Sequence, residues 1–122
     1  MAVDIDFRAA LVAWAPLVAV VGAKVVENGI VEGQTPPYVV FTTDDQPHQT
    51  LGGDDAGGIT TIQVECWSTS ALLAAALSKH VKDALKASPV AVAACATVLS
   101  ELTGFDPDLG LDAAILSIEW WR

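Results

Sequence analysis

Basic residues are scarce in this sequence. Six lysines and arginines stand against fifteen aspartates and glutamates in 122 residues, for a formal net charge of −9 at pH 7. A protein that wraps a nucleic-acid backbone neutralises phosphates with clustered lysine and arginine, whereas the basic residues here are scattered along the chain. We therefore predict no high-affinity binding to DNA or RNA and no attachment to an anionic membrane surface.

Cysteine is also rare, with Cys66 and Cys95 as the two examples. Neither belongs to a CxxC pair, so the sequence lacks the ligand pattern of a zinc ribbon. Cys66 lies within a predicted strand, where a free cysteine commonly behaves as a small buried apolar residue. A nucleophile dyad of Cys66 with His80 is an alternative, and a disulfide between the two cysteines stays open at this point.

The motifs of common catalytic and nucleotide-binding sites are absent. In the segment QPHQTLGGDDAGG, residues 46–58, no lysine follows the glycines as a phosphate-binding loop requires. The chain has no GxSxG or HExxH motif, and the acidic residues do not follow the spacing of an EF-hand. We predict no enzymatic activity and no cofactor.

A looser site for a divalent metal ion is one alternative for this acidic segment. Carboxylates and an imidazole that converge on one loop can bind such an ion. The candidate ligands are Asp44, Asp45, His48, Asp54 and Asp55. The simpler interpretation is a solvated loop without a metal, and we adopt it.

The N-terminal segment has an apolar stretch but no basic region before it, since Asp4 and Asp6 come first. A secretory signal peptide begins with basic residues, and the apolar stretch, interrupted by Pro16, is too short to span a bilayer. We expect a protein that is made in the cytoplasm and has no membrane anchor.

Two helices are predicted from the spacing of apolar residues. The first covers residues 4–21 and should stop or restart near Trp14–Ala15, because Pro16 has no N–H and clashes with the preceding turn. The second covers residues 70–87, is amphipathic, and has Thr69 or Ser70 as its N-terminal cap.

Strands are predicted between and after the helices. They cover a short stretch within 24–35, then 38–43, 59–68, 92–103 and 113–121. The last strand alternates, with Ala114, Leu116, Ile118 and Trp120 on one face and Ile115, Ser117, Glu119 and Trp121 on the other. Both faces are partly apolar, which indicates burial on two sides or against a partner.

The element order α-(β)-β-β-α-β-β predicts an α+β fold. We expect a mainly antiparallel sheet of about four to five strands, with two helices packed on one face. Residues 1–122 fit a single domain. Residues 44–58 would form a long, mobile loop between two strands, since glycine, proline and acidic residues disfavour strand pairing.

Several segments follow one another in a recognisable order. VG at 21–22 is followed by PPYVVF at 36–41, by IQVECWSTS at 62–70 running directly into ALLAAALSKHVKDAL, and by FDPDLGLDAAILSIEWW near the end. This order resembles the tail-completion (tail terminator) family of long-tailed bacteriophages, which has relatives in gene transfer agents. The resemblance covers nearly the whole chain. It departs at the stretch 24–35, where family members often place a basic or aromatic residue.

The resemblance implies a virion structural protein without catalysis. Such proteins form a ring, typically hexameric, at the head-proximal end of the tail tube, where they end polymerisation of the major tail tube protein. They also provide the surface that joins the tail to the head-tail connector protein, and DNA passes through the ring without specific binding. The protein would be assembled in the bacterial host cytoplasm and end in the virion tail.

Two other functions stay open beside the terminator. One is a head-closure or connector adaptor of the same particle, and the other is a small metal-binding module that uses the acidic loop. Under the terminator hypothesis, eight residues are candidates for the subunit or tube interface: Asp44, Asp45, His48, Leu51, Asp54, Asp55, Trp67 and Trp121.

Overall fold

The computed structural model describes residues 3–22, 24–27, 36–49, 55–88, 96–108 and 110–121, with the backbone alone described at 3–5, 45–49 and 55–58. The elements in chain order are α1 (Val3–Val12), α2 (Ala15–Val21), β1 (Val25–Glu27), β2 (Tyr38–Gln49), β3 (Asp55–Ser68), α3 (Ala71–Ala87), β4 (Ala96–Asp106) and β5 (Leu111–Trp121).

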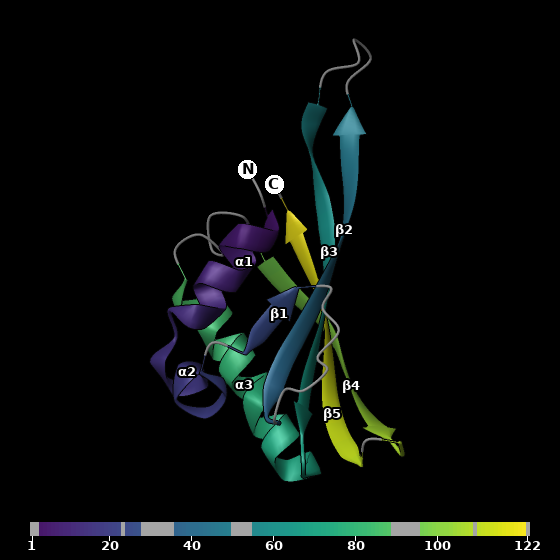
Figure 1. Ribbon diagram of the computed structural model, residues 1–122. Helices are drawn as coiled ribbons and strands as arrows, with labels where there is room; N and C mark the ends of the chain where they lie inside the picture. Colours follow the sequence, from purple (N-terminus) through teal and green to yellow (C-terminus); the bar gives the residue numbers. More distant parts are fainter. Residues whose placement is uncertain are drawn as a thin grey trace.

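The described strands form one five-stranded sheet in the order β1-β2-β3-β5-β4. The short strand β1 runs parallel to β2, and the other neighbouring pairs are antiparallel. The helices pack on the same side of this sheet (Figure 1). The predicted α+β class is confirmed, with three described helices in place of two.

The extra helix arises from the break predicted near Pro16. The backbone of Trp14 is extended, and α2 begins at Ala15 with proline in its first turn, where the missing N–H leaves no hydrogen bond unmade. At the start of α3, Ser70 is the cap, because its side chain accepts a hydrogen bond of 3.1 Å from the Leu73 N–H.

No helix in the described part of the chain is long and apolar enough to cross a membrane.

The main core lies between the helices and the sheet. Phe7 of α1 packs edge-on against Phe41 of β2 and Trp120 of β5, with ring centroids 5.0 and 6.3 Å apart. The predicted alternation in β3 and β5 is confirmed, since one face of each strand is fully buried in this core. Its members from those two strands are Ile62, Val64, Cys66, Ala114, Leu116, Ile118 and Trp120.

The predicted loop at 44–58 is wrong for most of its length. β2 continues to Gln49 and β3 begins at Asp55, and Pro47 still pairs with Gly58, beside a bulge. A proline can sit in a strand whose N–H side has no neighbour, and β1 pairs with β2 only as far as Phe41. The connection at 50–54 lies outside the described residues.

The hairpin of β2 and β3 extends past the rest of the sheet (Figure 1). The first residue of β3 that pairs with β5 is Ile59, opposite Trp121. Residues 55–58 therefore pair with β2 alone in the described structure, and we call this two-stranded part, 47–49 with 55–58, the hairpin extension.

The predicted turn at 104–110 is shorter than expected. Gly104, Phe105 and Asp106 still pair with β5, so β4 ends at Asp106 and the turn follows it. Gly110 has a φ of 66° and donates a hydrogen bond of 2.8 Å to the Asp106 carbonyl. The strand prediction of 92–103 is thus wrong at its C-terminal end, and residues 92–95 lie outside the described part.

Candidate assembly interface

Strand β4 is an edge strand with an unusual number of exposed apolar side chains. It pairs with β5 on one side and has no described neighbour on the other. Leu102 and Phe105 are 63% and 61% exposed, and Val98 and Leu99 are exposed as well. An edge of this kind offers free backbone hydrogen-bonding groups together with apolar surface, which is a combination that favours pairing with another chain.

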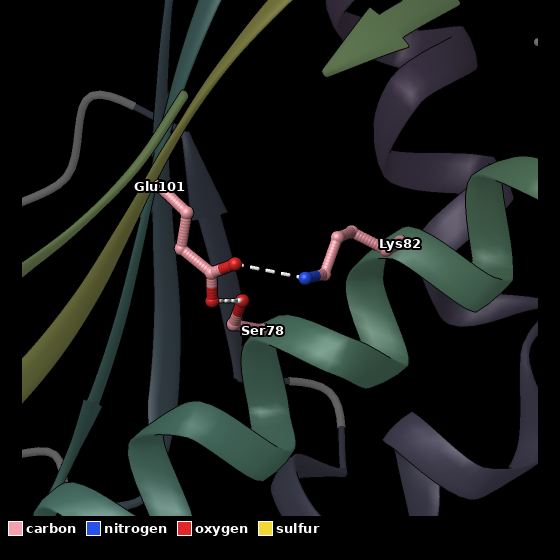
Figure 2. Close-up of polar contacts among 3 residues, drawn as sticks. All are labelled: Ser78, Lys82 and Glu101. Atoms are coloured by element: carbon pink, nitrogen blue, oxygen red, sulfur yellow. Dashed lines mark hydrogen bonds and ion pairs between the residues drawn. The ribbon is translucent and has the colours of Figure 1, made fainter. Parts of the chain in front are cut away.

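A polar contact holds this edge strand against the helical layer. Figure 2 shows Glu101 of β4 pointing toward α3, where Ser78 and Lys82 meet its two carboxylate oxygens. The Ser78 hydroxyl donates to Oε1 at 2.5 Å, and the Lys82 ammonium lies 2.8 Å from Oε2. The hydrogen bonds from Lys82 and Ser78 lower the pKa of Glu101. The contact fixes β4 in place without covering its outer edge.

The sheet face away from the helices, here called the open face, has a small apolar cluster at one end. Tyr38, Val40 and Leu111 are buried there, with Trp67 packed against them. Burial, followed by the nearby carboxylates of Asp106 and Glu65, raises the pKa of Tyr38. The hydroxyl of Tyr38 is therefore a neutral donor in an acidic neighbourhood.

The open face is acidic along its length. The strand pairings place Asp44, Glu65 and Glu119 on this side, opposite in direction to the core residues next to them. None of the described strands contains a lysine or arginine, whereas Arg8, Lys79, Lys82 and Lys86 all lie on helices. Within the described strands, the negative charge of the sheet is thus not balanced by basic residues.

The candidate interface residues whose side chains are described do not lie at one point. Trp67 and Trp121 both lie on the open face, but Trp121 pairs with Ile59, eight positions from Trp67 along β3. At about 3.3 Å per residue this separation is about 26 Å. Trp67 belongs to the apolar cluster, whereas Trp121 is 47% exposed.

The acidic candidates lie on or near the projecting hairpin. Asp44 is exposed and pairs with Thr61. Only the backbone strand positions of Asp45, His48 and Asp55 are described, and Leu51 and Asp54 fall outside the described residues. Where side chains are described, no group of three or more histidine, cysteine or carboxylate residues could hold a metal ion. Asp44 is the one proposed ligand within that set, so the metal hypothesis gains no support and is not tested.

Cys66 is the buried apolar residue that its strand position predicts. Its side chain is fully buried in the core. Burial first, and then the charge of Glu101, raises the pKa of the Cys66 thiol to about 12. The thiol is therefore protonated at neutral pH, whereas a nucleophile requires the thiolate. Cys95 and any pairing with it lie outside the described residues.

Sequence reasoning missed the exposed apolar residues of β4 as individual candidates. The sequence predicts a strand that includes Val98, Leu99 and Leu102, but it does not separate the buried positions of this strand from the exposed ones. A bulge between Val98 and Ser100 shifts the register, so simple alternation could not assign faces here. The sequence does show several large apolar residues in this strand together with the charged Glu101, and this mixture indicates a strand that is only partly buried.

The chain resembles a known solved structure in fold. It matches a chain of the virion of a native gene transfer agent particle with a TM-score of 0.68 and 18% sequence identity, over 93% of this chain and 92% of that one. The sequence matches none of the curated proteins with which it was compared. The model of the family described as tail completion protein gp17 matches residues 6–122. Since this match covers nearly the whole chain, the protein belongs to the tail completion protein gp17 family.

Proposed function

We propose that this protein is a structural component of the virion tail that forms a homo-oligomeric ring at the head-proximal end of the tail tube. The ring, most simply a hexamer, ends polymerisation of the major tail tube protein and provides the surface that joins the head-tail connector. Residues 1–122 act as a single domain in this role. Membership of the tail completion family supports the tail assignment.

The exposed edge of β4 is the observation that best supports the formation of a ring. A head-to-tail contact between identical subunits uses two different surfaces, and it closes into a ring when the rotation between subunits permits. β4 is well suited to be one of these surfaces, because Leu99, Leu102 and Phe105 are all more than half exposed on an edge strand. Each subunit would pack this edge against a different surface of its neighbour.

The open face is our candidate for the channel lining. DNA is a polyanion, so a channel with acidic residues and without lysine or arginine lets it pass without adhering. The described strands meet this condition, with Asp44, Glu65 and Glu119 on the open face. Edge contacts through β4 would keep the sheets of adjacent subunits next to one another around the channel.

The projecting hairpin is our candidate for the contact with the tube or with the next subunit. It reaches beyond the rest of the sheet (Figure 1). Of the candidate interface residues, His48 and Asp55 belong to the hairpin extension, and Leu51 and Asp54 to the sequence that connects its strands. Asp44, Asp45 and Trp121 lie at its base, where β5 still pairs with β3.

A charge placed on the β4 edge tests the ring. Leu102→Asp puts a carboxylate on the proposed interface, and Leu72→Asp is a matched control, because Leu72 is 85% exposed on α3. In sedimentation velocity and negative-stain microscopy, we expect Leu102→Asp to lose the ring while Leu72→Asp keeps it. A wild-type protein that stays monomeric, even when mixed with purified tail tubes, would contradict the proposal.

The position in the tail is tested separately. Purified tubes of the major tail protein, mixed with the wild-type ring, should carry it at one end and should stop growing there. A ring that binds the connector protein but leaves tube length unchanged would instead favour the adaptor function. Circular dichroism of both variants checks that neither substitution has unfolded the domain.

A further inference from the structure

The sheet has two edges on which another strand could pair. One is β4, and the other is the part of β2 beyond Phe41, because β1 pairs with β2 only from Val39 to Phe41. Among the residues that the structure describes, no strand pairs with the outer side of β2 from Thr42 onward. A free edge is a template on which another strand can add. A subunit with two such edges can therefore join one neighbour on each side.

The two edges lie at the same level of the sheet. The strand pairings connect Asp44 of β2, through β3 and β5, to Thr97 of β4 in one row across the sheet. The next row connects Thr43 to Val98 in the same way. A head-to-tail contact that shifts each subunit along the axis gives an open helix, whereas one without a shift can close into a ring. For strands that run along the ring axis, edges at the same level join without a shift.

The strand directions and the charges also fit. Three antiparallel pairings separate β2 from β4, so the two strands run in opposite directions and would pair antiparallel between neighbours in a continuous sheet. Like charges directly opposite one another destabilise such a pairing. The acidic residues Asp44 and Asp45 of β2 would instead stand opposite Thr97 and Ala96, which have no charge.

The other half of β4 would run beside β1 of the neighbour, which stands one strand further out than β2. β4 has its bulge between Val98 and Ser100, next to the row in which β1 ends, and a bulge bends its strand. Leu102, past the bulge, shares a row with Val26 of β1. Leu102 is 63% exposed and Val26 is half-buried, so a contact between them covers apolar surface.

We propose that adjacent subunits of the ring join sheet to sheet, with residues 96–100 of β4 paired antiparallel to residues 42–45 of β2 in the neighbour. This contact rests on the ring proposed above and names the surface that receives β4. It makes one continuous sheet around the channel. The hairpin extension lies beyond the paired residues, so it stays available for the tail tube.

Cysteine cross-linking tests the pairing and its register. A chain with Thr97→Cys and Asp44→Cys, in a Cys95→Ser background, presents two exposed thiols, while the native Cys66 stays buried. Within one chain the two positions are three strand spacings apart, about 14 Å, which exceeds the reach of a disulfide. Mild oxidation of the assembled ring should therefore link neighbours and give a ladder of covalent oligomers on non-reducing electrophoresis.

The matched control places the β4 thiol elsewhere on the same strand. Thr103 is exposed like Thr97 but lies six positions away, about 20 Å along β4. The chain with Thr103→Cys and Asp44→Cys should give at least about fivefold less cross-linked product, because a disulfide requires Cβ atoms about 4 Å apart. Sedimentation velocity of the reduced variants checks that each still forms the ring.

The outcomes separate this contact from the ring itself. Rings that form without a ladder from positions 44 and 97, or with equal cross-linking from 44 and 103, would overturn the pairing and leave the ring standing. Covalent dimers of a chain that carries Thr97→Cys alone would show a symmetric contact between two β4 edges, which also overturns it. A wild-type chain that stays monomeric with tail tubes present would overturn both.

Discussion

Truncation of Trp120 tests whether the core between helices and sheet is correctly placed. The side chain of Trp120 is fully buried and packs against Phe7 of α1. An aromatic residue of this kind buries about 150–250 Å², which at about 25 cal/mol per Å² corresponds to about 4–6 kcal/mol as an upper value. Measured Trp→Ala and Phe→Ala substitutions in cores cost about 3–5 kcal/mol.

One feature of Trp120 reduces the expected cost. Its indole Nε1 is buried without a hydrogen-bond partner, and removal of such a group relieves about 1–3 kcal/mol of desolvation penalty. We therefore expect Trp120→Ala to lower the free energy of unfolding by about 3 kcal/mol. Trp120→Phe should cost only about 1 kcal/mol, because it keeps one ring in place and removes the unpartnered N–H.

Urea unfolding followed by far-ultraviolet circular dichroism measures both changes, since this signal does not depend on tryptophan fluorescence. The slope of the free energy with urea should stay constant across the variants, so that the shift in midpoint reports stability. A cost below about 1 kcal/mol for Trp120→Ala, combined with loss of oligomers, would place Trp120 in a subunit interface and refute its position in the core.

Three further predictions concern single residues. Glu101→Gln should destabilise the fold by about 0.5–1 kcal/mol at neutral pH, the range of a partly exposed ion pair. Because folding lowers the pKa of Glu101 below its ordinary value of 4.5, the extra stability of the wild type should be complete above pH 4.5 and disappear as the pH falls through the pKa of the folded state. Urea titrations at several pH values can follow this change. In a Cys95→Ser background, Cys66 should not react with a thiol reagent until the protein unfolds, since its thiol is buried and its pKa is raised to about 12; reaction at the rate of a free thiol would contradict this. Gly110→Ala should cost about 1 kcal/mol because φ is 66° there, whereas Gly104→Ala, with ordinary contact at 3.5 Å to Ile115, should stay within about 0.5 kcal/mol, as thermal unfolding can compare.

Alternation and helical spacing predicted the parts of the fold that bury one face. β3 and β5 have a strict period of two, so the side on which Ile62 or Trp120 lies follows from the strand assignment alone. The break at Pro16 and the cap at Ser70 follow from local hydrogen-bonding chemistry. These features need no knowledge of distant contacts.

Strand ends and the candidate sites depend on contacts that the sequence does not display. Pro47 and Gly58 are poor strand residues, yet they pair because the preceding part of the hairpin already aligns them. The exposed edge of β4 likewise depends on the sheet order β1-β2-β3-β5-β4, which leaves β4 with one described neighbour and which the sequence does not display.

The hairpin extension has a thermodynamic consequence for assembly. Residues 55–58 pair only with β2, whereas β3 from Ile59 onward is held by β2 and β5 together. A two-stranded ribbon in water is marginally stable by itself, so amide hydrogens should exchange faster in the hairpin extension, residues 47–49 and 55–58, than in the three-stranded part. A neighbouring chain that packs on this ribbon would slow that exchange. Binding of a neighbour at the hairpin extension could then be measured as slower exchange of the amide hydrogens that are least protected in the free subunit. If the bound neighbour also orders the extension for the next contact, the addition of each subunit would depend on the one before it.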